Sequence, residues 1–456
     1  MHQLPRYTQY RDSGLPWVGE IPAHWSTRRN RYLFREVDRR SKNGEETHLS
    51  MSQVHGLVPS KDLGRKSLQS ENYAGGKLVA EHDLVLNRLK AHLGVFARAK
   101  QAGVVSPDYT VLRPKRGTSV QYCESLFKTP MYVGEFRRRT KGIVEGFWRL
   151  YTDDFYDVSA LLPPPEEQDK IVAYLRVQDA HIARFIKAKR DLIGLLTEQK
   201  LRIIDHAVTR GLDASVRLKP SGIEWLGDVP EHWELRRLKF LASNVTSQTT
   251  TKASDEIYLA LEHVESWTGV ARPLEGEVEF ASTAKQFVAD DVLFGKLRPY
   301  LAKVTRAVRA GVCVSEFLVL RSRKDLVLPA YLEQLLRCKR VIDLINSSTA
   351  GAKMPRADWT FIGNVQLPVP LVGEQEEILS FIDRETKDLD ETIARAHDEI
   401  ALIREYRDRL IADAVTGQVD LRGWQPGPDD VAGDDELAAL GDDEADPAEE
   451  DADGDE

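Results

Sequence analysis

SGLPWVGEIPAHW, at Ser13–Trp25, recurs as SGIEWLGDVPEHW at Ser221–Trp233, 208 positions further along the chain. Both copies have tryptophan, glycine, proline and histidine at the same places. A long match of uncommon residues at a fixed distance is typical of a duplicated structural unit. We therefore expect other parts of the chain to recur at the same distance.

Further blocks do recur at nearly that distance. The segment DLVLNRLK at Asp83–Lys90 matches DVLFGKLR at Asp291–Arg298. Residues 163–175, PPPEEQDKIVAYL, match residues 370–382, PLVGEQEEILSFI, with a separation of 207. The matches extend over nearly the whole chain, which predicts two copies of one unit of about 208 residues.

The composition is typical of a globular protein. Of the 456 residues, 42% are apolar and 30% are charged, and this length suffices for roughly two to four domains. No segment is a candidate for a membrane span, and the start of the chain lacks the pattern of a secretory signal. We therefore expect a cytoplasmic protein. The three cysteines form no close pair, so neither a zinc knuckle nor a disulfide scaffold is indicated.

The charge is distributed unevenly. Residues 429–456 contain fifteen carboxylates and no Lys or Arg; without these fifteen charges the net charge of −9 becomes +6 for residues 1–428. An acidic run with few large apolar residues predicts a disordered tail, which either promotes solubility or mimics nucleic acid. The basic remainder is compatible with a polyanionic partner.

Each copy has two parts. About 140 residues show short strand-like runs separated by Gly, Pro, Asn and Asp. A proline cluster and acidic residues then predict the start of a helix. Apolar residues occupy seven of ten positions spaced alternately four and three apart from Ile171 to Ile203, and eight of eleven from Ile378 to Ala414. This spacing predicts two long helices of roughly 50–60 Å that pack on each other as a coiled coil, although any long surface helix has an apolar stripe.

The usual catalytic and cofactor motifs are absent from the sequence. It contains no P-loop, no G-x-G-x-x-G after a strand and no H-E-x-x-H. A nuclease-like set can be assembled only from Pro107-Asp108 and Glu198-Gln199-Lys200, which lie about 90 residues apart, and chance explains this set better than function. His24 and His232 recur within the duplicated stretch and could be paired functional groups, one in each half. We favour the alternative that Trp and Pro build a compact turn that packs against the helices, with each His bonding local backbone.

Basic residues recur in the strand-rich parts. Such side chains contact DNA phosphates or guanine edges, although a solvated surface is an alternative for each of them. The candidate DNA-binding residues are Arg88, Lys90, Arg137, Arg138, Arg139 and Lys141 in the first copy, and Lys296, Arg298, Lys353 and Arg356 in the second.

The sequence resembles the specificity subunits of type I restriction-modification enzymes. The likeness rests on the duplicated stretch with its continuations, on FGKLRPYLAKV, and on PPPEEQDKIVAYL with GEQEEILSFID, and it covers residues 5–423. The resemblance implies an α+β fold with two repeated α/β target-recognition domains, separated by two long antiparallel helices that form a coiled coil. The acidic tail lies outside the family pattern.

The resemblance also implies domain bounds. These are a first target-recognition domain at 1–162, a helical spacer at 163–212, a second target-recognition domain at 213–369, a second spacer at 370–423, and the disordered tail at 424–456.

The function implied by the resemblance is DNA recognition without catalysis. Each domain would read one half of a bipartite, asymmetric site on double-stranded DNA, and the helices would set the gap between the halves. Two adenine-N6 methyltransferase subunits would dock on the helices, and motor-nuclease restriction subunits would join them. The chain would hold no cofactor, since S-adenosylmethionine, magnesium and ATP would bind the partner subunits. The alternatives are a free-standing nuclease or methyltransferase component, or a coiled-coil scaffold without sequence preference.

Overall fold

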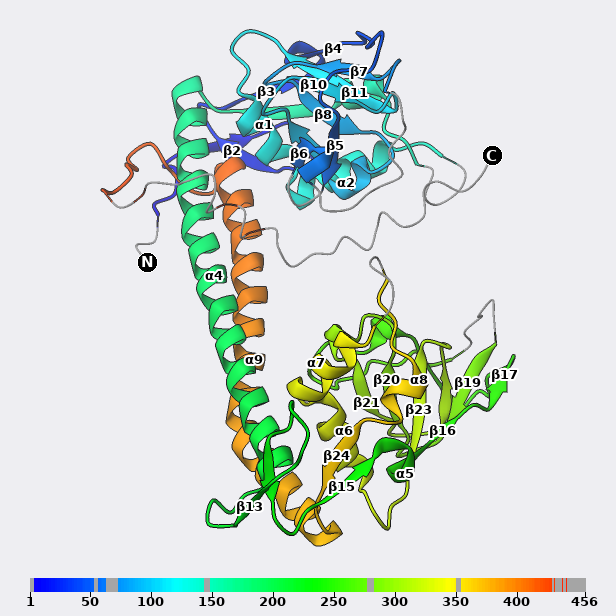
Figure 1. Cartoon of the computed structure of the whole chain (residues 1–456). Coiled ribbons are helices and arrows are strands. Elements are labelled where there is room, and N and C mark those ends of the chain that lie inside the picture. Colours follow the sequence, from blue (N-terminus) through cyan, green and yellow to red (C-terminus); the bar gives the residue numbers. More distant parts are fainter. Residues whose placement is uncertain are drawn as a thin grey trace. The chain divides into compact units, whose positions relative to one another are not determined.

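The computed structural model describes residues 4–52, 56–62, 73–142, 148–276, 283–349, 354–428, 430, 437 and 440 (Figure 1). The chain forms two compact units. Unit 1 contains residues 1–191 and 396–456, and unit 2 contains residues 192–395. The boundaries fall inside two long helices, so each unit contains the beginning of one helix and the end of the other.

Unit 1 consists of short strands and helices followed by the start of a long helix. Its elements are β1 (Tyr10–Asp12), β2 (Glu20–Pro22), β3 (Ser26–Arg29), η1 (Asn30–Tyr32), β4 (Phe34–Glu36), β5 (Leu49–Ser52), β6 (Gly56–Pro59), η2 (Ser60–Asp62), β7 (Lys77–Val79), β8 (Leu84–Asn87), η3 (Ala91–Leu93), β9 (Phe96–Arg98), β10 (Gly103–Val105), β11 (Tyr109–Pro114), α1 (Val120–Phe127), α2 (Pro130–Arg139), α3 (Thr152–Asp157) and β12 (Ser159–Leu162).

Unit 2 has a similar succession of elements. They are β13 (Leu218–Pro220), β14 (Asp228–Pro230), β15 (Glu234–Arg237), α5 (Leu238–Leu241), β16 (Ala242–Val245), β17 (Gln248–Thr249), β18 (Ile257–Leu259), η4 (Leu261–His263), β19 (Ala284–Phe287), β20 (Val292–Gly295), η5 (Pro299–Leu301), β21 (Val304–Arg306), β22 (Gly311–Cys313), β23 (Phe317–Ser322), α6 (Pro329–Arg337), α7 (Lys339–Ser347), α8 (Trp359–Ile362) and β24 (Gln366–Val369).

A four-stranded antiparallel sheet lies at the centre of each unit. Its strand order is β4-β11-β8-β9 in unit 1 and β16-β23-β20-β21 in unit 2. Since β4, β8, β9 and β11 lie 208 positions before β16, β20, β21 and β23, strands of equal rank come from matching sequence. Two-stranded sheets complete unit 1, among them β3 with β12, and β15 pairs with β24 in the same way in unit 2. Unit 2 also has a second four-stranded sheet of order β17-β19-β22-β18, in which β18 and β22 are parallel.

The central sheet is covered on both faces by apolar residues. Along β8, Leu84 and Leu86 belong to the core shared with the helices, whereas Val85 between them belongs to a second core on the opposite face. In β20, Val292 and Phe294 alternate with Leu293 in the same way. Successive side chains of a strand point to opposite faces, so these nearly continuous apolar runs are the expected sequence for a sheet buried on both sides.

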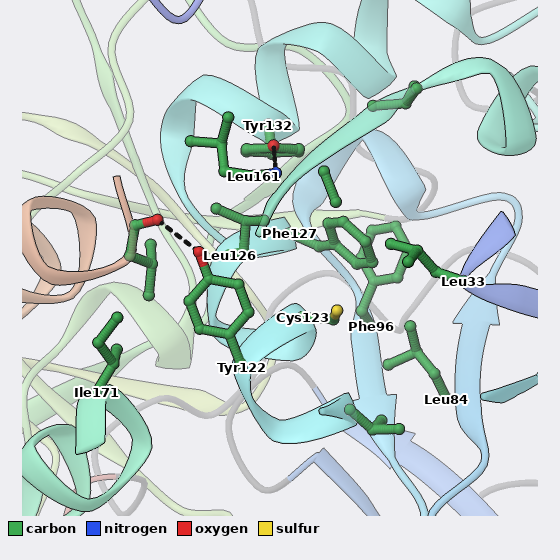
Figure 2. Packing of buried hydrophobic residues seen from close by; sticks show 14 of the residues in the cluster. Leu33, Leu84, Phe96, Tyr122, Cys123, Leu126, Phe127, Tyr132, Leu161 and Ile171 are labelled. Atoms are coloured by element: carbon green, nitrogen blue, oxygen red, sulfur yellow. Dashed lines mark hydrogen bonds between the residues drawn. The ribbon is translucent and has the colours of Figure 1, made fainter. Parts of the chain in front are cut away.

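The larger core of unit 1 is rich in aromatic rings. Figure 2 shows Phe96 and Phe127 next to the α1 residues Tyr122 and Cys123, with Ile171 of the long helix beside Tyr122. The ring centroids of Phe96 and Phe127 lie 5.8 Å apart at a tilt of 49°, within the range that aromatic pairs prefer. This core therefore joins the sheet to the beginning of the long helix.

The two long helices are α4 (Pro165–Arg210, 46 residues) and α9 (Val372–Val415, 44 residues), and each is about 65–70 Å long at 1.5 Å per residue. A glycine with positive φ follows each helix: Gly211, at +75°, directly after α4, and Gly417, at +77°, two residues after the end of α9. A Cβ at Gly417 would lie 2.4 Å from Pro22 Cδ, so glycine is required there for both backbone conformation and space.

Ion pairs join α4 and α9 within each unit. Asp179 pairs with Arg407, whose Nε donates at 2.6 Å, and Lys189 pairs with Glu399 in unit 1. In unit 2, Lys200 Nζ lies 2.6 Å from Asp390 Oδ1. The residue numbers rise along one helix as they fall along the other, so the helices run antiparallel within each unit.

The buried positions of α4 differ in part from the predicted heptad seam. Ile171, Leu175 and Ile182 are buried as expected. Phe185 and Leu192, however, are 38% and 37% exposed, and Ile204 is buried where the seam named its neighbour Ile203. A straight α-helix has 3.6 residues per turn and drifts from a strict seven-residue repeat by about 20° per heptad. None of the described helices has a stretch long and apolar enough to span a bilayer.

Candidate nucleic-acid interface

A buried carboxylate orders the turn that precedes the central strand of each unit. Arg113 Nε and Nη2 donate to the two oxygens of Asp83 at 2.9 and 2.7 Å. Arg321 binds Asp291 in the same way at 2.8 and 2.7 Å. Both aspartates are 1% exposed, and the hydrogen bonds that each arginine donates to its carboxylate raise the pKa of that arginine. These bidentate pairs fix the start of β8 and β20, whose other ends carry the first candidate DNA-binding residues.

Arg88 and Lys90 follow β8. The Arg88 guanidinium Nε donates to the carbonyl oxygen of Asp108 at 2.7 Å, and the Arg88 carbonyl accepts from the Leu150 amide at 3.1 Å. Lys90 immediately precedes η3. Arg88 is therefore held against the backbone of a neighbouring loop, with a quarter of its side chain exposed.

One buried carboxylate, Glu135, pairs with two residues of the Arg137–Arg139 cluster. These three residues form the last turn of α2. Arg139 Nε donates to Glu135 at 2.8 Å, and Arg138 lies 3.4 Å from the other oxygen of the same buried carboxylate. The guanidinium carbon of Arg137 lies 5.8 Å from the ring centroid of Trp148.

Lys141 and the neighbourhood of η3 complete the first set. Lys141 Nζ lies 2.8 Å from Asp154 Oδ1, with 66% of its side chain exposed. The rings of His92 in η3 and Trp148 meet edge to face, with their centroids 5.9 Å apart. Burial and the charge of Arg137 lower the pKa of His92. The structure thus brings Arg137 close to the η3 loop that follows Lys90.

Three candidate DNA-binding residues of unit 2 lie where residues 296–298 are hydrogen-bonded to residues 355–357. The Arg298 amide donates to the Pro355 carbonyl at 2.8 Å, and Leu297 forms a bridge with Arg356. The Ala357 amide donates to the Lys296 carbonyl at 2.9 Å. Lys296, Arg298 and Arg356 therefore lie together. Lys353 lies outside the described residues.

The side chains of this second set differ in how far they are paired. Arg356 Nη2 pairs with Glu316 at 3.0 Å. Lys296 and Arg298 have no side-chain hydrogen bond or ion pair to the part of the chain that the structure describes. Arg298 has a φ of +50° and is exposed. Since a non-glycine residue rarely adopts positive φ, the close backbone contact with Pro355 holds Arg298 in this conformation.

The histidines of the duplicated stretch bind a helix carboxylate, so the expectation that they bond local backbone was wrong. Near the start of α4, Glu167 accepts from His24 Nε2 at 2.8 Å, from Trp25 Nε1 at 3.1 Å, and from the Tyr7 hydroxyl. The carboxylate and burial raise the pKa of Tyr7. The partners lie more than 140 positions apart, which is why adjacent sequence did not reveal the contact.

The same arrangement, in which a glutamate in the first turn of a long helix accepts from His and Trp, occurs at the start of α9; we call it the carboxylate clamp. Glu374 accepts from His232 Nε2 at 2.9 Å and from Trp233 Nε1 at 2.9 Å. Trp25 is 2% exposed and Trp233 is fully buried, so the expected packing of the tryptophans is present. The signal that could have revealed these contacts is the recurrence of Glu beside Gln in PEEQ and GEQE at a separation of 207, close to the 208 that separates the tryptophans.

Each unit also binds the end of the long helix that begins in the other unit. The Tyr122 hydroxyl donates to the carbonyl of Val415 in α9, and the Tyr331 hydroxyl donates to Val208 in α4. Unit 1 therefore holds the beginning of α4 and the end of α9, whereas unit 2 holds the beginning of α9 and the end of α4. The same contacts recur with the roles of the helices exchanged.

The described residues contain no group of His, Cys, Asp and Glu arranged to hold a metal ion. The three cysteines are buried free thiols, and burial raises the pKa of Cys123 and of Cys313 to about 12. Thiols in this state are poor nucleophiles.

Comparison with known proteins points to one class. Over 305 residues the chain is 22% identical to the type I restriction enzyme EcoDI specificity subunit of Escherichia coli, a match that spans 63% of this chain and 68% of that protein. No protein-family model matches the chain.

Solved structures show the same likeness in fold. A chain from a study of complex assembly and conformational transition of the type I restriction-modification system matches with a TM-score of 0.56 at 14% identity, over 88% of this chain and 99% of that one. The HsdS subunit of Thermoanaerobacter tengcongensis matches at 14% identity over 88% and 98%, with a TM-score of 0.39. The chain resembles type I specificity subunits in its sequence, and the first of these structures in its fold. This resemblance supports a role in DNA sequence specificity.

Proposed function

We propose that this chain is the DNA-sequence-specificity subunit of a type I restriction-modification complex, that it lies in the cytoplasm, and that it has no catalytic site. It binds a bipartite, asymmetric site with one target-recognition domain per half. The observation that carries the proposal is that the two units make equivalent contacts with opposite ends of the two helices. Each unit has the same strand order in its central sheet; a glutamate at the start of one helix and a carbonyl at the end of the other bind each unit in the same way. Two equivalent domains suit two half-sites on a duplex.

The proposed domains are residues 1–162 and 213–369, with helical spacers at 163–212 and 370–423 that form an antiparallel coiled coil. In this proposal the spacers fix the distance between the half-sites. Support comes from the antiparallel ion pairs within each unit, and from Glu167 and Glu374, through which each domain is anchored to a helix.

The two domains would read different sequences. Arg137, Arg138 and Arg139 occupy the end of α2, whereas the equivalent turn of α7, 209 positions later, has Asn346, Ser347 and Ser348. Contacts to base edges specify a sequence, whereas contacts to phosphates position the protein. A difference in surface chemistry at the same structural position is what recognition of two unlike half-sites requires.

The helices would dock two methyltransferase subunits, which restriction subunits then join. Leu195 in α4 and Leu402 in α9 are separated by the 207 positions that relate the two helices, and they are 65% and 63% exposed. Large apolar residues left in solvent at matching positions favour a partner that binds twice.

Mapping of methylated adenines tests the proposal. The full chain is co-expressed with the methyltransferase subunit of its own system, and N6-methyladenine is mapped across the host DNA. We expect one split motif with a modified adenine in each half, which disappears when this chain is omitted. Methylation that does not depend on the chain would contradict the proposal, as would a partner that is active on other DNA yet finds no motif with this chain. Nuclease or methyltransferase activity of the purified chain alone would instead support a free-standing enzyme.

A further inference from the structure

A basic and aromatic surface recurs in both units beside the strand that leads out of the tryptophan turn. We define it by Arg29, Arg31 and Tyr32 in unit 1, and by Arg237, Lys239 and Phe240 in unit 2. The members of each pair are 208 positions apart. Tyr32 and Phe240 are 61% and 50% exposed.

The local structure explains why these side chains face the solvent. In η1, Asn30 is buried and Leu33 follows in the core; in α5, Leu238 and Leu241 are buried. The buried residues thus lie three positions apart, with two residues between them. The positions between them, Arg31 and Tyr32, and Lys239 and Phe240, do not contribute to the core.

The basic side chains of unit 1 share one exposed carboxylate. Arg31 Nη2 donates a hydrogen bond to Asp157 Oδ1, Arg29 Nη1 lies 3.7 Å from the same oxygen, and the three side chains are between 42% and 57% exposed. In unit 2 the equivalent of Asp157 is Asn364, whose side-chain oxygen lies 3.4 Å from Arg237. Exposed pairs of this kind contribute little to stability, so the cations can exchange these partners for another.

The recurrence of these residues is not explained by folding. Buried positions recur because both units pack the same core, but an exposed ring gains nothing from folding. The match of Tyr with Phe shows that the ring, rather than the hydroxyl, is the common feature. A basic residue also precedes each ring in the sequence, and in unit 2 Lys239 Nζ lies 5.5 Å from the ring centroid of Phe240.

We propose that this surface docks a protein partner that binds the chain twice, through an acidic face that contains a pocket for one aromatic ring. The inference rests on the proposed function, in which that partner is the methyltransferase subunit. Arginine and aromatic residues are the groups that protein interfaces concentrate at their centres. DNA phosphates would use the cations alone, because Phe240 has no polar atom.

Binding measurements with five variants test the proposal, the fifth of which is a conservative exchange in unit 1. The unit 1 variant carries Arg31→Glu with Tyr32→Ala, the unit 2 variant carries Lys239→Glu with Phe240→Ala, and a combined variant carries all four changes. The matched control carries Arg309→Glu with Val308→Ala, which alters an exposed cation and a 79% exposed apolar side chain without a counterpart in unit 1. Methyltransferase binding to the full chain is followed by isothermal titration and native mass spectrometry. DNA binding by the chain alone is measured over a range of salt concentrations.

We expect each single-unit variant to bind one methyltransferase subunit as the wild type does and the second about tenfold more weakly. The combined variant weakens both, and the control weakens neither. Arg31→Lys with Tyr32→Phe, which gives unit 1 the residues of unit 2, retains wild-type affinity. DNA affinity and its salt dependence stay unchanged in all variants, which also shows that the chains are folded.

Two results would overturn the inference. If the combined variant binds two methyltransferase subunits with wild-type affinity, the surface is not their docking site. If that variant instead loses salt-dependent affinity for DNA, the surface contacts phosphates. These results leave the proposed function intact. A wild-type chain that binds no methyltransferase at all would remove both the proposed function and this inference.

Discussion

The Tyr122 hydroxyl donates a 2.9 Å hydrogen bond to the carbonyl oxygen of Val415, 293 positions away at the end of α9. Tyr331 and Val208 have the same relationship in unit 2 at 3.1 Å. Carbonyls in the last turn of a helix have no intrahelical partner, and here a buried phenol from the strand-rich part supplies one. Burial raises the pKa of both tyrosines well above the ordinary value, so the hydroxyls remain donors throughout the physiological pH range.

Removal of these hydroxyls should destabilise the junctions. Tyr122→Phe and Tyr331→Phe each leave a buried carbonyl without its donor, which costs about 1–3 kcal/mol. We expect a lower urea midpoint for each variant, measured by tryptophan fluorescence. Tyr151→Phe, at a 45% exposed position, is the control and should leave the midpoint unchanged. Equal midpoints for all three variants would contradict the role of the two bonds.

Loss of the helix-start carboxylates should affect the two units unequally. Glu167→Ala removes the acceptor of Tyr7, His24 and Trp25, whereas Glu374→Ala removes that of His232 and Trp233 only. Hydrogen bonds to charged groups are worth about 1.5–3 kcal/mol each, so we expect the larger loss of stability in unit 1. Amide hydrogen exchange in β2 and β14 would measure the two units separately. Faster exchange in β14 than in β2 would argue against this ranking.

The buried Asp83–Arg113 pair should be needed for folding of unit 1. Arg113→Ala leaves the buried Asp83 carboxylate without its counterion, and breaking such a pair costs about 3–5 kcal/mol. Arg306→Ala provides the comparison, because its pair with Asp290 is about 39% exposed on both sides and surface pairs contribute about 0–1 kcal/mol. Thermal unfolding followed by circular dichroism would compare the variants, and similar losses in both would contradict the importance of burial.

DNA binding provides a test of the proposed interface in unit 2. Lys296→Ala and Arg298→Ala remove cations that have no partner among the described residues, so their loss does not leave an internal carboxylate unpaired. We expect each change to weaken binding and to reduce the slope of log K against log salt by about one. By contrast, Arg138→Ala and Arg139→Ala together leave the buried Glu135 unpaired, so their effect would combine stability with binding. An unchanged slope for both unit 2 variants would exclude these residues from the phosphate contacts.

The length of the helices should set the gap between half-sites. Insertion of seven residues into both α4 and α9 keeps the side-chain pattern and adds about 10 Å at 1.5 Å per residue. Because duplex DNA rises about 3.4 Å per base pair, we expect the methylated motif to keep both halves while the gap grows by about three pairs. The control carries the same insertion in α4 alone. It should lose methylation because α4 and α9 then differ in length. An unaltered gap after the double insertion would contradict the role of the helices as spacers.

The fold was predictable from sequence where its determinants are local. The apolar runs at β8 and β20, the prolines ahead of α4 and α9, and the long apolar spacing all depend on neighbours within a few turns of chain. The heptad seam failed at Phe185 and Leu192, because a straight helix does not keep a seven-residue register over this length. The prediction for His24 and His232 failed for another reason: their acceptors lie about 142 positions away.

The duplication itself was determined by the sequence alone, since matching blocks at 207–208 positions need no coordinates to be found. The same holds for the class of elements in each copy, because backbone preference and apolar period act over short distances. Tertiary structure decided which copy holds which helix end. Glu167 and Val415 accept hydrogen bonds from side chains of unit 1, and Glu374 and Val208 accept them from side chains of unit 2. Buried polar groups need hydrogen-bond partners, and only the packed chain determines which groups lie close enough. Tertiary structure also decided which cations are paired: Arg138 and Arg139 contact a buried carboxylate, while Lys296 and Arg298 form no side-chain ion pair with the described residues.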